Sequence, residues 1–171
     1  MMILLKAADH LPFFRQPSAK QIEAGNYAKK HRKVRGLDIT IENQRGTIRK
    51  GVDKGGNEWA VSMQHDYGYI KGTLGIDGDH FDVVLGPNSA APQVWVITTK
   101  APPAFKKDDE QKAMIGFNSE DEARAAFKGM YDDPRFCGAV VEMPMDEFKR
   151  KVRTTRQDPK MLKGIVLIFK R

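Results

Sequence analysis

Apolar and polar residues alternate along much of the segment between residues 37 and 99. The stretches LDITIE (37–42) and EWAVSM (58–63) alternate with a period of two, as half-buried strands do. The stretch QVWVITT (93–99) is the clearest candidate for a buried strand. Turn-forming stretches rich in Gly, Asn and Asp separate these runs at spacings of roughly ten residues. This pattern predicts many short strands joined by tight turns.

The pattern changes beyond residue 116, where helical spacing replaces alternation. The stretch FNSEDEARAAFKGM (117–130) predicts a helix that opens with a capping box from Ser119 to Glu122. PMDEFKRKV (144–152) predicts another helix, with Pro144 near its start. GAVVEM (138–143) and GIVLIFK (164–170) are expected to be strands, and a further helix is expected after Ser18. Together these elements indicate a mostly-β α+β fold: a small, mostly antiparallel barrel with helices packed outside it.

The charges are unevenly distributed along the 171 residues. Residues 1–50 carry a net charge of +7, residues 51–148 carry −8, and residues 149–171 carry +8. We therefore expect a basic N-terminal extension (1–36), one central domain (37–152) and a basic C-terminal segment (153–171) that ends in a strand. The basic ends would suit nucleic acid or a partner protein, whereas the acidic middle would suit a cation.

The lone cysteine, Cys137, excludes an internal disulfide, which favours a reducing cytoplasmic setting. The apolar run at the start, MMILLKAADHLPFF, is short, and no small-residue cleavage site follows it. We interpret it as neither a signal peptide nor a membrane span. The sequence does not decide the oligomeric state, and a homo-oligomer is compatible with it.

The stretch DYGYIKGTLGIDGDHFDVVLGP (66–87) places Asp77, Asp79 and Asp82 within six residues. A tight hairpin turn would explain Asp77 and Gly78, because Asp-Gly is a strong turn signal. It does not explain Asp82, which falls inside an apolar strand. Three converging carboxylates repel one another unless a cation such as Mg²⁺ binds between them. An EF-hand calcium loop does not fit, because the sixth and twelfth positions are Asp82 and Asn88.

The same stretch resembles the signature of the soluble family I inorganic pyrophosphatases. The match runs in order through Tyr67-Gly68-Tyr69-Ile70, Thr73, Asp77-Gly78-Asp79 and Asp82-Val83. The chain is most similar to the pyrophosphatase-like domain of phage and mobile-element polyvalent proteins, in which a strand ending Ile-Glu-Asn comes earlier. Here ITIEN (39–43) fits that strand, and His80 stands where the enzymes usually have Pro. The resemblance implies a five-stranded antiparallel barrel with outer helices over residues 37–152.

The resemblance also implies roles for the motif residues. Asp77 and Asp82 would bind Mg²⁺, and Asp79 would orient or deprotonate the attacking water. Tyr67 matches a tyrosine that donates to phosphate, although a half-buried barrel aromatic is an alternative. Glu42 matches an early acidic residue of the site, placed here with the metal ligands, although an exposed strand carboxylate is equally compatible with the sequence.

A later acidic cluster supplies the remaining expected ligand. In KKDDEQKAMIGF (106–117), the resemblance assigns Asp109 to the metal and Lys112 to phosphate. The spacing is imperfect, so Asp108 or Glu110 could take the ligand role instead. A solvated charged loop is the alternative for this segment.

The phosphate-binding half departs from the family pattern. The family's lysine two residues before the early Glu is Thr40 here, and its arginine has no aligned partner. Arg49 is our preferred substitute, with Lys50 and Lys54 as alternatives. The basic cluster that begins at residue 29 could fold over the site and supply Lys30 or His31, or it could be a solvated arm.

These observations lead to three functional hypotheses. The first is Mg²⁺-dependent hydrolysis of pyrophosphate or a related phosphoanhydride by a phage- or prophage-encoded enzyme in the host cytoplasm. The second is a catalytically altered module on the same fold, serving as a virion component or binding DNA or a partner through its basic ends. A weaker third hypothesis is a Mg²⁺-dependent nuclease, because two-metal chemistry is shared between these enzyme classes.

Overall fold

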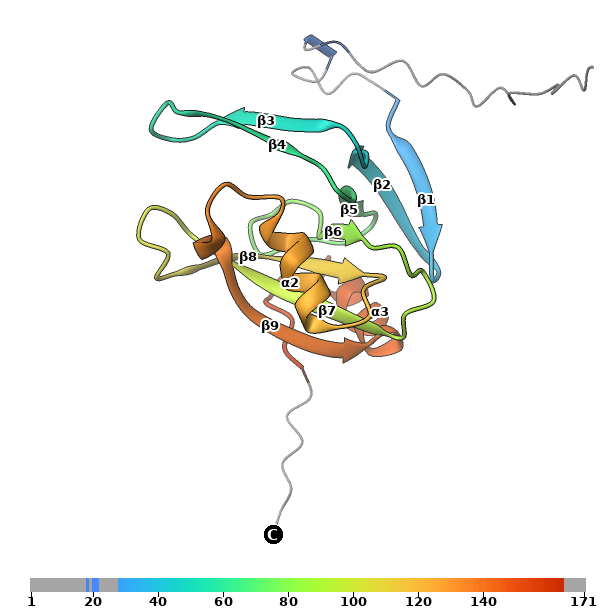
Figure 1. Cartoon of the computed structure of the whole chain (residues 1–171). Helices are drawn as coiled ribbons and strands as arrows, with labels where there is room; N and C mark the ends of the chain where they lie inside the picture. Colours follow the sequence, from blue (N-terminus) through green and yellow to red (C-terminus); the bar gives the residue numbers. More distant parts are fainter. Residues whose placement is uncertain (1–17, 19, 22–27, 165–171) are drawn as a thin grey trace, which may run out of the picture.

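The computed structural model describes residues 18, 20–21 and 28–164. Figure 1 shows a mostly-β α+β architecture, as the alternating pattern predicted. The elements with described bounds are β1 (Lys30–Val34), β2 (Leu37–Asn43), β3 (Ile48–Val52), β4 (Glu58–Ser62), β5 (Asp66–Ile70), β6 (Asp82–Leu85), β7 (Gln93–Lys100), β8 (Asp108–Ile115), α2 (Glu120–Lys128), the 3₁₀-helix η1 (Pro134–Phe136), β9 (Cys137–Pro144) and α3 (Met145–Thr154).

Seven of the strands form one sheet in the order β1-β2-β5-β6-β8-β7-β9, and β3 and β4 form a separate hairpin. The end strands β1 and β9 do not pair with each other among the described residues, so the closed five-stranded barrel is not confirmed. The pairing is mostly antiparallel, as predicted, and β6 and β8 form the one parallel pair among the described strands. The cause is the path of the chain: β8 returns antiparallel to β7 and inserts between β7 and β6.

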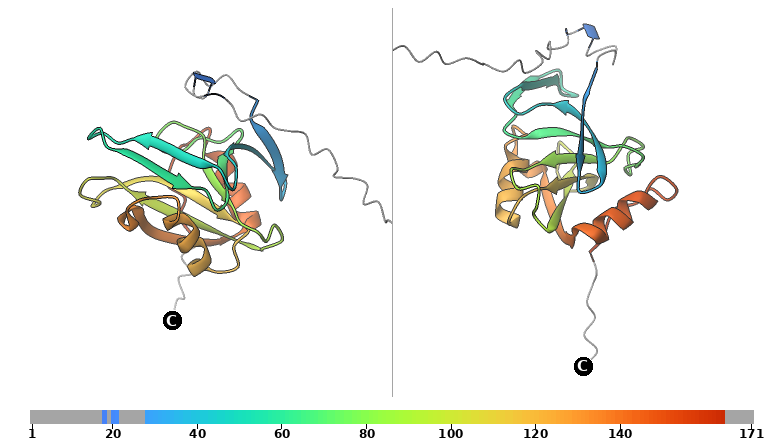
Figure 2. Two further views of the ribbon diagram at one scale, coloured as in Figure 1. Left: turned by 45° about the horizontal axis from the view of Figure 1, so that its top comes forward. Right: turned by 90° about the vertical axis from the view of Figure 1, so that its right-hand side faces the viewer.

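The two helices cover opposite faces of the large sheet. Phe148 and Val152 of α3 belong to one core cluster, and Ala123 and Phe127 of α2 belong to the other. Figures 1 and 2 show the β3–β4 hairpin on one side of the molecule and both helices toward the other. The cluster that includes α2 also contains Tyr67, which places this motif tyrosine on the α2 face of the sheet.

Ser119 caps the start of α2 as predicted, but the reciprocal bond of the capping box comes from the residue before it. The Ser119 hydroxyl accepts a hydrogen bond from the Glu122 backbone N–H at 3.2 Å. The Glu122 carboxylate in turn accepts one from the Asn118 backbone N–H at 2.8 Å. These bonds satisfy N–H groups that lack helical partners, so the helix begins at Glu120, inside the predicted range.

Both basic ends contribute to the folded unit. β1, from the segment expected to be an extension, pairs with β2 along its whole length. Near the other end, Leu162 is buried, and its backbone hydrogen-bonds the Gln111 side chain through both its N–H and its carbonyl. The strand expected at 164–170 lies outside the described residues except for Gly164, and the helix expected after Ser18 is described only at residues 20 and 21. The division into three segments stays a prediction.

Over the described part of the chain, no helix combines the length and the apolar character needed to cross a membrane.

Candidate functional site

Five carboxylates line one pocket of about 480 Å³, which we call the acidic pocket. They come from β2, β6, β8 and the loop between β5 and β6, so several strands deliver acidic side chains to one place. Two tyrosines of β5, a histidine and a lysine complete the lining. The lining residues are Lys29, Glu42, Tyr67, Tyr69, Asp77, Asp79, His80, Asp82 and Glu110.

The Tyr-Gly-Tyr sequence of β5 has a direct structural reason. Side chains alternate along a strand, so Tyr67 and Tyr69 share a face, and both line the pocket. Gly68 lies between them, opposite the place where the register of β2 shifts. A Cβ at Gly68 would fall 1.9 Å from the Thr40 carbonyl oxygen, so only glycine allows this approach of the two strands.

A buried lysine ties the centre of the site together. Lys112 is 2% exposed, and its register partner on the neighbouring parallel strand is Asp82. Its Nζ lies 2.5 Å from Asp82 Oδ2 and 2.7 Å from Glu110 Oε1. It also lies 3.3 Å from the Tyr67 hydroxyl, which itself donates to Asp82 Oδ2 at 2.5 Å. Two carboxylates, a phenol and an ammonium therefore form one hydrogen-bonded network.

The electrostatics of this network follow from its burial. Burial alone lowers the pKa of the Lys112 ammonium, but the acidic side chains around it, including Asp82 and Glu110, outweigh that effect and hold its pKa well above the usual value. Burial raises the pKa of Glu110, although Lys112 opposes the shift. Burial likewise raises the pKa of Tyr67 well above its ordinary value. Lys112 thus stays a cation and Tyr67 a neutral hydroxyl at neutral pH.

The Asp-Gly-Asp segment both forms a turn and faces the pocket. The Asp77 carboxylate accepts a hydrogen bond from the Asp79 backbone N–H at 3.2 Å, the local bond of an Asx-type turn. Next to it, the His80 ring stacks on Tyr69 with centroids 4.7 Å apart. His80 Nδ1 lies 2.9 Å from the Thr73 carbonyl oxygen, so Nδ1 carries the hydrogen and donates it.

The basic N-terminal segment supplies one cation to the pocket. Lys29, immediately before β1, lies 2.6 Å from Glu42 Oε1 and 5.2 Å from the centre of the Tyr69 ring. Lys30 and His31, the residues we expected there, do not line the pocket among the described residues. His31 instead contacts Thr40, with Nδ1 3.2 Å from the hydroxyl. The basic residue at the pocket is therefore Lys29, one residue before the first of the two expected candidates.

The structure brings together most of the predicted site residues, but it separates two of them from the pocket. Glu42, Tyr67 and the three motif aspartates line the pocket. Lys112 is buried behind two of the lining residues and contacts the carboxylates of Asp82 and Glu110. Asp109 does not line the pocket, because alternation along β8 places Glu110 and Lys112 on the inward face. Arg49 lines a neighbouring pocket, where its guanidinium lies 5.0 Å from the Tyr67 ring centre.

The donor chemistry of the acidic pocket fits a hard divalent cation, since its carboxylates offer only oxygen ligands. Over the described residues, no three His, Cys, Asp or Glu side chains are grouped closely enough to hold a metal ion as they stand. Lys112 and Lys29 occupy positions beside the acidic groups instead.

Three lining residues, Lys29, Tyr69 and His80, had no role assigned by the sequence analysis, and Glu110 was named there only as an alternative ligand. Glu110 has the same strand parity as Lys112, and Tyr69 has the same parity as Tyr67. Period-two alternation would therefore have selected both. Lys29 belongs to the basic cluster that the sequence had marked, but only the start of β1 shows that this position reaches the pocket.

A family model described as Inorganic Pyrophosphatase matches residues 19–153 of the chain. This match includes every strand and helix of the described fold except the final residue of α3. A search of curated proteins gave no match.

Proposed function

Because the chain belongs to the inorganic pyrophosphatase family, we propose that it hydrolyses pyrophosphate, or a related phosphoanhydride, in the acidic pocket with Mg²⁺ as its cofactor. The observation that carries this proposal is the convergence of five carboxylates and the buried Lys112 at a single pocket built around the family motif.

Asp77, Asp82 and Glu110 are the residues we assign to the metal, with Glu42 as a further oxygen ligand. Glu110 replaces Asp109 in this assignment because it lines the pocket and shares Lys112 with Asp82. A bound divalent cation would supply positive charge against the phosphate oxygens and make a water molecule more acidic. All four side chains line the same pocket.

The chain's own groups account for the rest of the reaction. Asp79, exposed at the mouth of the pocket, orients the attacking water and accepts its proton. The water oxygen bonds to one phosphorus, the bridging P–O bond breaks, and two phosphates leave. Lys112 and the Tyr67 hydroxyl donate to phosphate oxygens, whose negative charge is spread in the transition state.

Lys29 compensates for the missing family lysine at Thr40. Its Nζ reaches Glu42 from the segment before β1, and it lines the pocket that would receive the substrate. A lysine is a suitable phosphate partner because its three donors can turn toward different oxygens. The altered phosphate-binding half is thus completed from a different part of the chain.

Phosphate release from pyrophosphate, measured with and without Mg²⁺, tests the proposal directly. We expect turnover that requires the metal, and Asp82→Asn should reduce it on the order of 10³-fold. Asp108→Asn is the matched control, because Asp108 is exposed on the same sheet and pairs with Lys100 at 2.5 Å, outside the acidic pocket. Absence of both turnover and Mg²⁺ binding would overturn the proposal and favour a binding or virion module.

The phage origin, the cytoplasmic or virion location, and nucleic-acid or partner binding by the basic ends stay predictions from the sequence. Mg²⁺-independent, salt-sensitive DNA binding by the intact chain would support the module hypothesis.

A further inference from the structure

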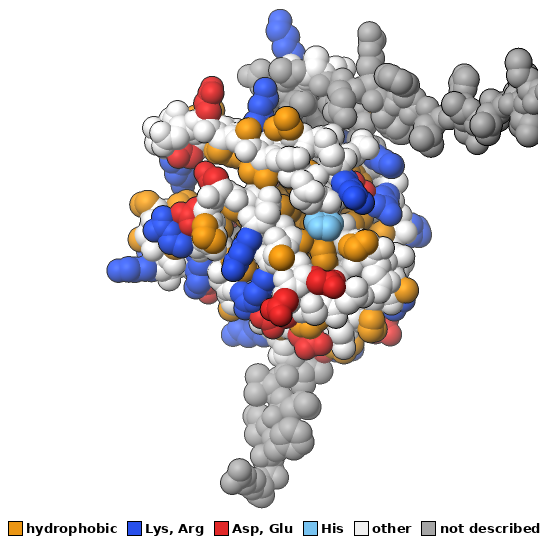
Figure 3. Space-filling model, in the orientation of Figure 1, with side chains coloured by type: hydrophobic (Ala, Val, Ile, Leu, Met, Phe, Trp, Pro, Cys, Tyr) orange, Lys and Arg blue, Asp and Glu red, His pale blue; other side chains and the backbone are white. Residues whose placement is uncertain are grey.

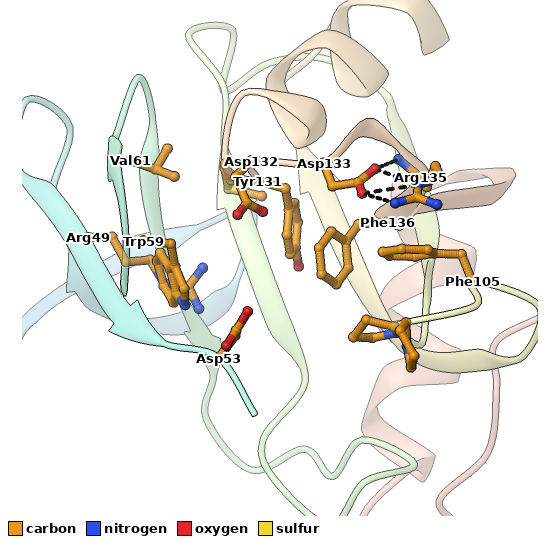
Figure 4. A pocket seen from close by; sticks show the side chains of 13 residues that line it. Arg49, Asp53, Trp59, Val61, Phe105, Tyr131, Asp132, Asp133, Arg135 and Phe136 are labelled. Atoms are coloured by element: carbon orange, nitrogen blue, oxygen red, sulfur yellow. Dashed lines mark hydrogen bonds and ion pairs between the residues drawn. The ribbon is translucent and has the colours of Figure 1, made fainter. Parts of the chain in front are cut away.

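A second pocket, of about 360 Å³, has a wall of aromatic rings, and we call it the aromatic pocket. Its lining includes Arg49, Trp59, Phe105, Tyr131, Arg135 and Phe136 (Figure 4). In the space-filling view, the molecule is hollowed between the β3–β4 hairpin and the body, with hydrophobic side chains visible in the hollow (Figure 3). The pyrophosphate reaction proposed above uses none of these aromatic groups.

One wall of the aromatic pocket is the inner face of the β3–β4 hairpin. Arg49 and Trp59 are half-buried, whereas Ile48 and Val52 on the outer face are 68% and 63% exposed. The Trp59 indole lies across Gly51, where a Cβ would come within 2.5 Å of the ring. Glycine at this position therefore lets a large flat side chain lie against the strand.

The opposite wall is formed by the segment that comes after α2 in the chain and by η1. Tyr131 stacks on Phe136 with centroids 4.6 Å apart, and Phe136 meets Phe105 edge-on at 5.0 Å. Figure 4 shows Trp59 on one side of the pocket and Tyr131 on the other, with the remaining rings behind Tyr131. Asp132 also lines the pocket, so a carboxylate acceptor is available beside the rings.

The aromatic and acidic pockets meet at Tyr67 and Arg49. The Arg49 guanidinium lies 5.0 Å from the ring centre of Tyr67, which lines the acidic pocket. The same guanidinium lies 5.2 Å from the ring centre of Trp59, which lines the aromatic pocket. Tyr67 and Tyr131 also pack in one core cluster on the α2 face of the sheet. A ligand longer than pyrophosphate can therefore contact both pockets past a single cation.

We propose that the aromatic pocket binds the base of a nucleoside di- or triphosphate whose phosphate chain extends past Arg49 into the acidic pocket. This inference rests on the proposed hydrolase function and specifies its substrate class. A nucleobase has the planar faces that stack on aromatic side chains, and such stacking tolerates different bases. Its exocyclic amino group suits Asp132, and its phosphates suit Arg49.

The reaction with a nucleoside diphosphate would follow the same course as with pyrophosphate. The water oxygen bonds to the terminal phosphorus, the bridging P–O bond breaks, and the bridging oxygen leaves with the nucleoside monophosphate. The proton from the water passes to Asp79 and then to solvent. One nucleoside diphosphate and one water thus give one nucleoside monophosphate and one phosphate.

The first test compares ADP with pyrophosphate as substrates of the full chain with Mg²⁺. We expect hydrolysis of both. Trp59→Ala should lower the ratio of kcat/KM for ADP to kcat/KM for pyrophosphate about 10-fold, mainly by raising the KM for ADP, and Trp59→Phe should restore most of it. Ile48→Ala, on the outer face of the same hairpin, is the matched control and should leave the ratio unchanged. An unchanged ratio in Trp59→Ala would overturn the inference.

A second test detects the base without turnover. The chain has two tryptophans, and Trp95 is buried with its indole N–H donating to the Phe117 carbonyl, so Trp59 is the one that can report a ligand. ADP should quench the wild-type fluorescence, and the quenching should disappear in Trp59→Phe. Ribose 5-phosphate carries a phosphate but no base and should not quench; equal quenching by it would overturn the inference.

The two tests separate the two proposals. Hydrolysis of pyrophosphate without ADP hydrolysis or ADP quenching would overturn the inference and leave the hydrolase in place. ADP quenching without hydrolysis of either compound would overturn the hydrolase and support base binding.

Discussion

The acidic and aromatic pockets lie side by side but are built in different ways. The acidic pocket takes four of its lining residues from a single stretch of six. Apart from Lys29, the rest lie on β2, β5 and β8, which are joined in one sheet through β6. The aromatic pocket collects residues from a separate hairpin, from the loop near residue 105 and from the segment after α2. The difference teaches that the acidic pocket is encoded largely in one local stretch of sequence, whereas the aromatic pocket depends on tertiary assembly.

The two pockets also differ in how firmly their walls are held. Lys112 is buried and shares hydrogen bonds with three acidic or phenolic groups, so a change there disturbs a whole network. The β3–β4 hairpin is not part of the large sheet, and its outer face exposes Ile48 and Val52. We therefore expect substitutions in the acidic pocket to alter both stability and turnover, and substitutions in the hairpin to alter substrate preference alone.

Lys112→Met gives the largest expected effect. The substitution leaves Asp82 and Glu110 facing each other without a cation, so the free energy of unfolding should fall by about 3 kcal/mol. Turnover should fall on the order of 10³-fold, because a group that we propose to contact phosphate is lost. Chemical denaturation with and without Mg²⁺ measures the first effect, and Mg²⁺ should recover part of the loss by binding the two carboxylates.

Lys71→Met is the control for that experiment, since Lys71 is exposed at the end of β5. Equal destabilisation by Lys71→Met and Lys112→Met would contradict the idea that the buried network sets the acidic pocket apart.

Tyr67→Phe should have a smaller effect at the same site. The phenylalanine keeps the ring in the core but removes the hydroxyl that donates to Asp82 at 2.5 Å. We expect a loss of about 1 kcal/mol in stability and about 10-fold in pyrophosphate turnover. Tyr69→Phe is the matched control and should cost less, because the stacking of Tyr69 on His80 survives the change. Equal turnover losses in the two variants would argue against a role for the Tyr67 hydroxyl.

Gly51→Ala sharpens the comparison from the aromatic side. The added methyl would lie 2.5 Å from the Trp59 ring, so the indole must move from its position against β3. The preference for ADP over pyrophosphate should fall about 5-fold, within the range expected for weakened base stacking. Steady-state kinetics on both substrates measures it, with Lys50→Ala on the outer face as control. An unaltered preference would show that the position of Trp59 does not matter for substrate choice.

Lys29→Met should have the smallest effect on stability. The Lys29–Glu42 pair is partly exposed, so its loss should cost less than about 1 kcal/mol. Turnover should fall a few-fold through a raised KM for pyrophosphate, with Lys30→Met as the neighbouring control. A larger KM change in Lys30→Met than in Lys29→Met would contradict the placement of Lys29 at the phosphate side.

Much of the acidic pocket could be predicted from the sequence, because many of its residues lie close together along the chain. Asp77, Asp79 and Asp82 could be assigned from one motif, and the Tyr-Gly-Tyr run could be placed on a strand. The proposed metal ligand on β8 was harder to assign from the sequence, because Asp108, Asp109 and Glu110 are three consecutive carboxylates. They are distinguished by the direction in which each side chain faces. The strand boundaries and the parallel pairing with β6 place Glu110, and neither aspartate, at the acidic pocket.

Local sequence patterns could not predict the open sheet or the aromatic pocket. Nothing in the spacing of β6, β7 and β8 indicates that the last inserts between the other two. In the sequence, the strands β5 to β8 and the helix α2 lie between Trp59 and Tyr131. Taken alone, each residue is a common kind of half-buried aromatic. Only the fold shows that they face each other across one pocket.

The most direct measurement compares Glu110→Gln with Asp109→Asn in phosphate release from pyrophosphate at saturating Mg²⁺. These neighbours differ in the direction they face on β8, so the pair tests whether the acidic pocket is the hydrolytic centre. We predict that Glu110→Gln loses about 100-fold in turnover and that Asp109→Asn stays within about 2-fold of the wild type. Loss of turnover in Asp109→Asn with activity retained in Glu110→Gln would contradict the account.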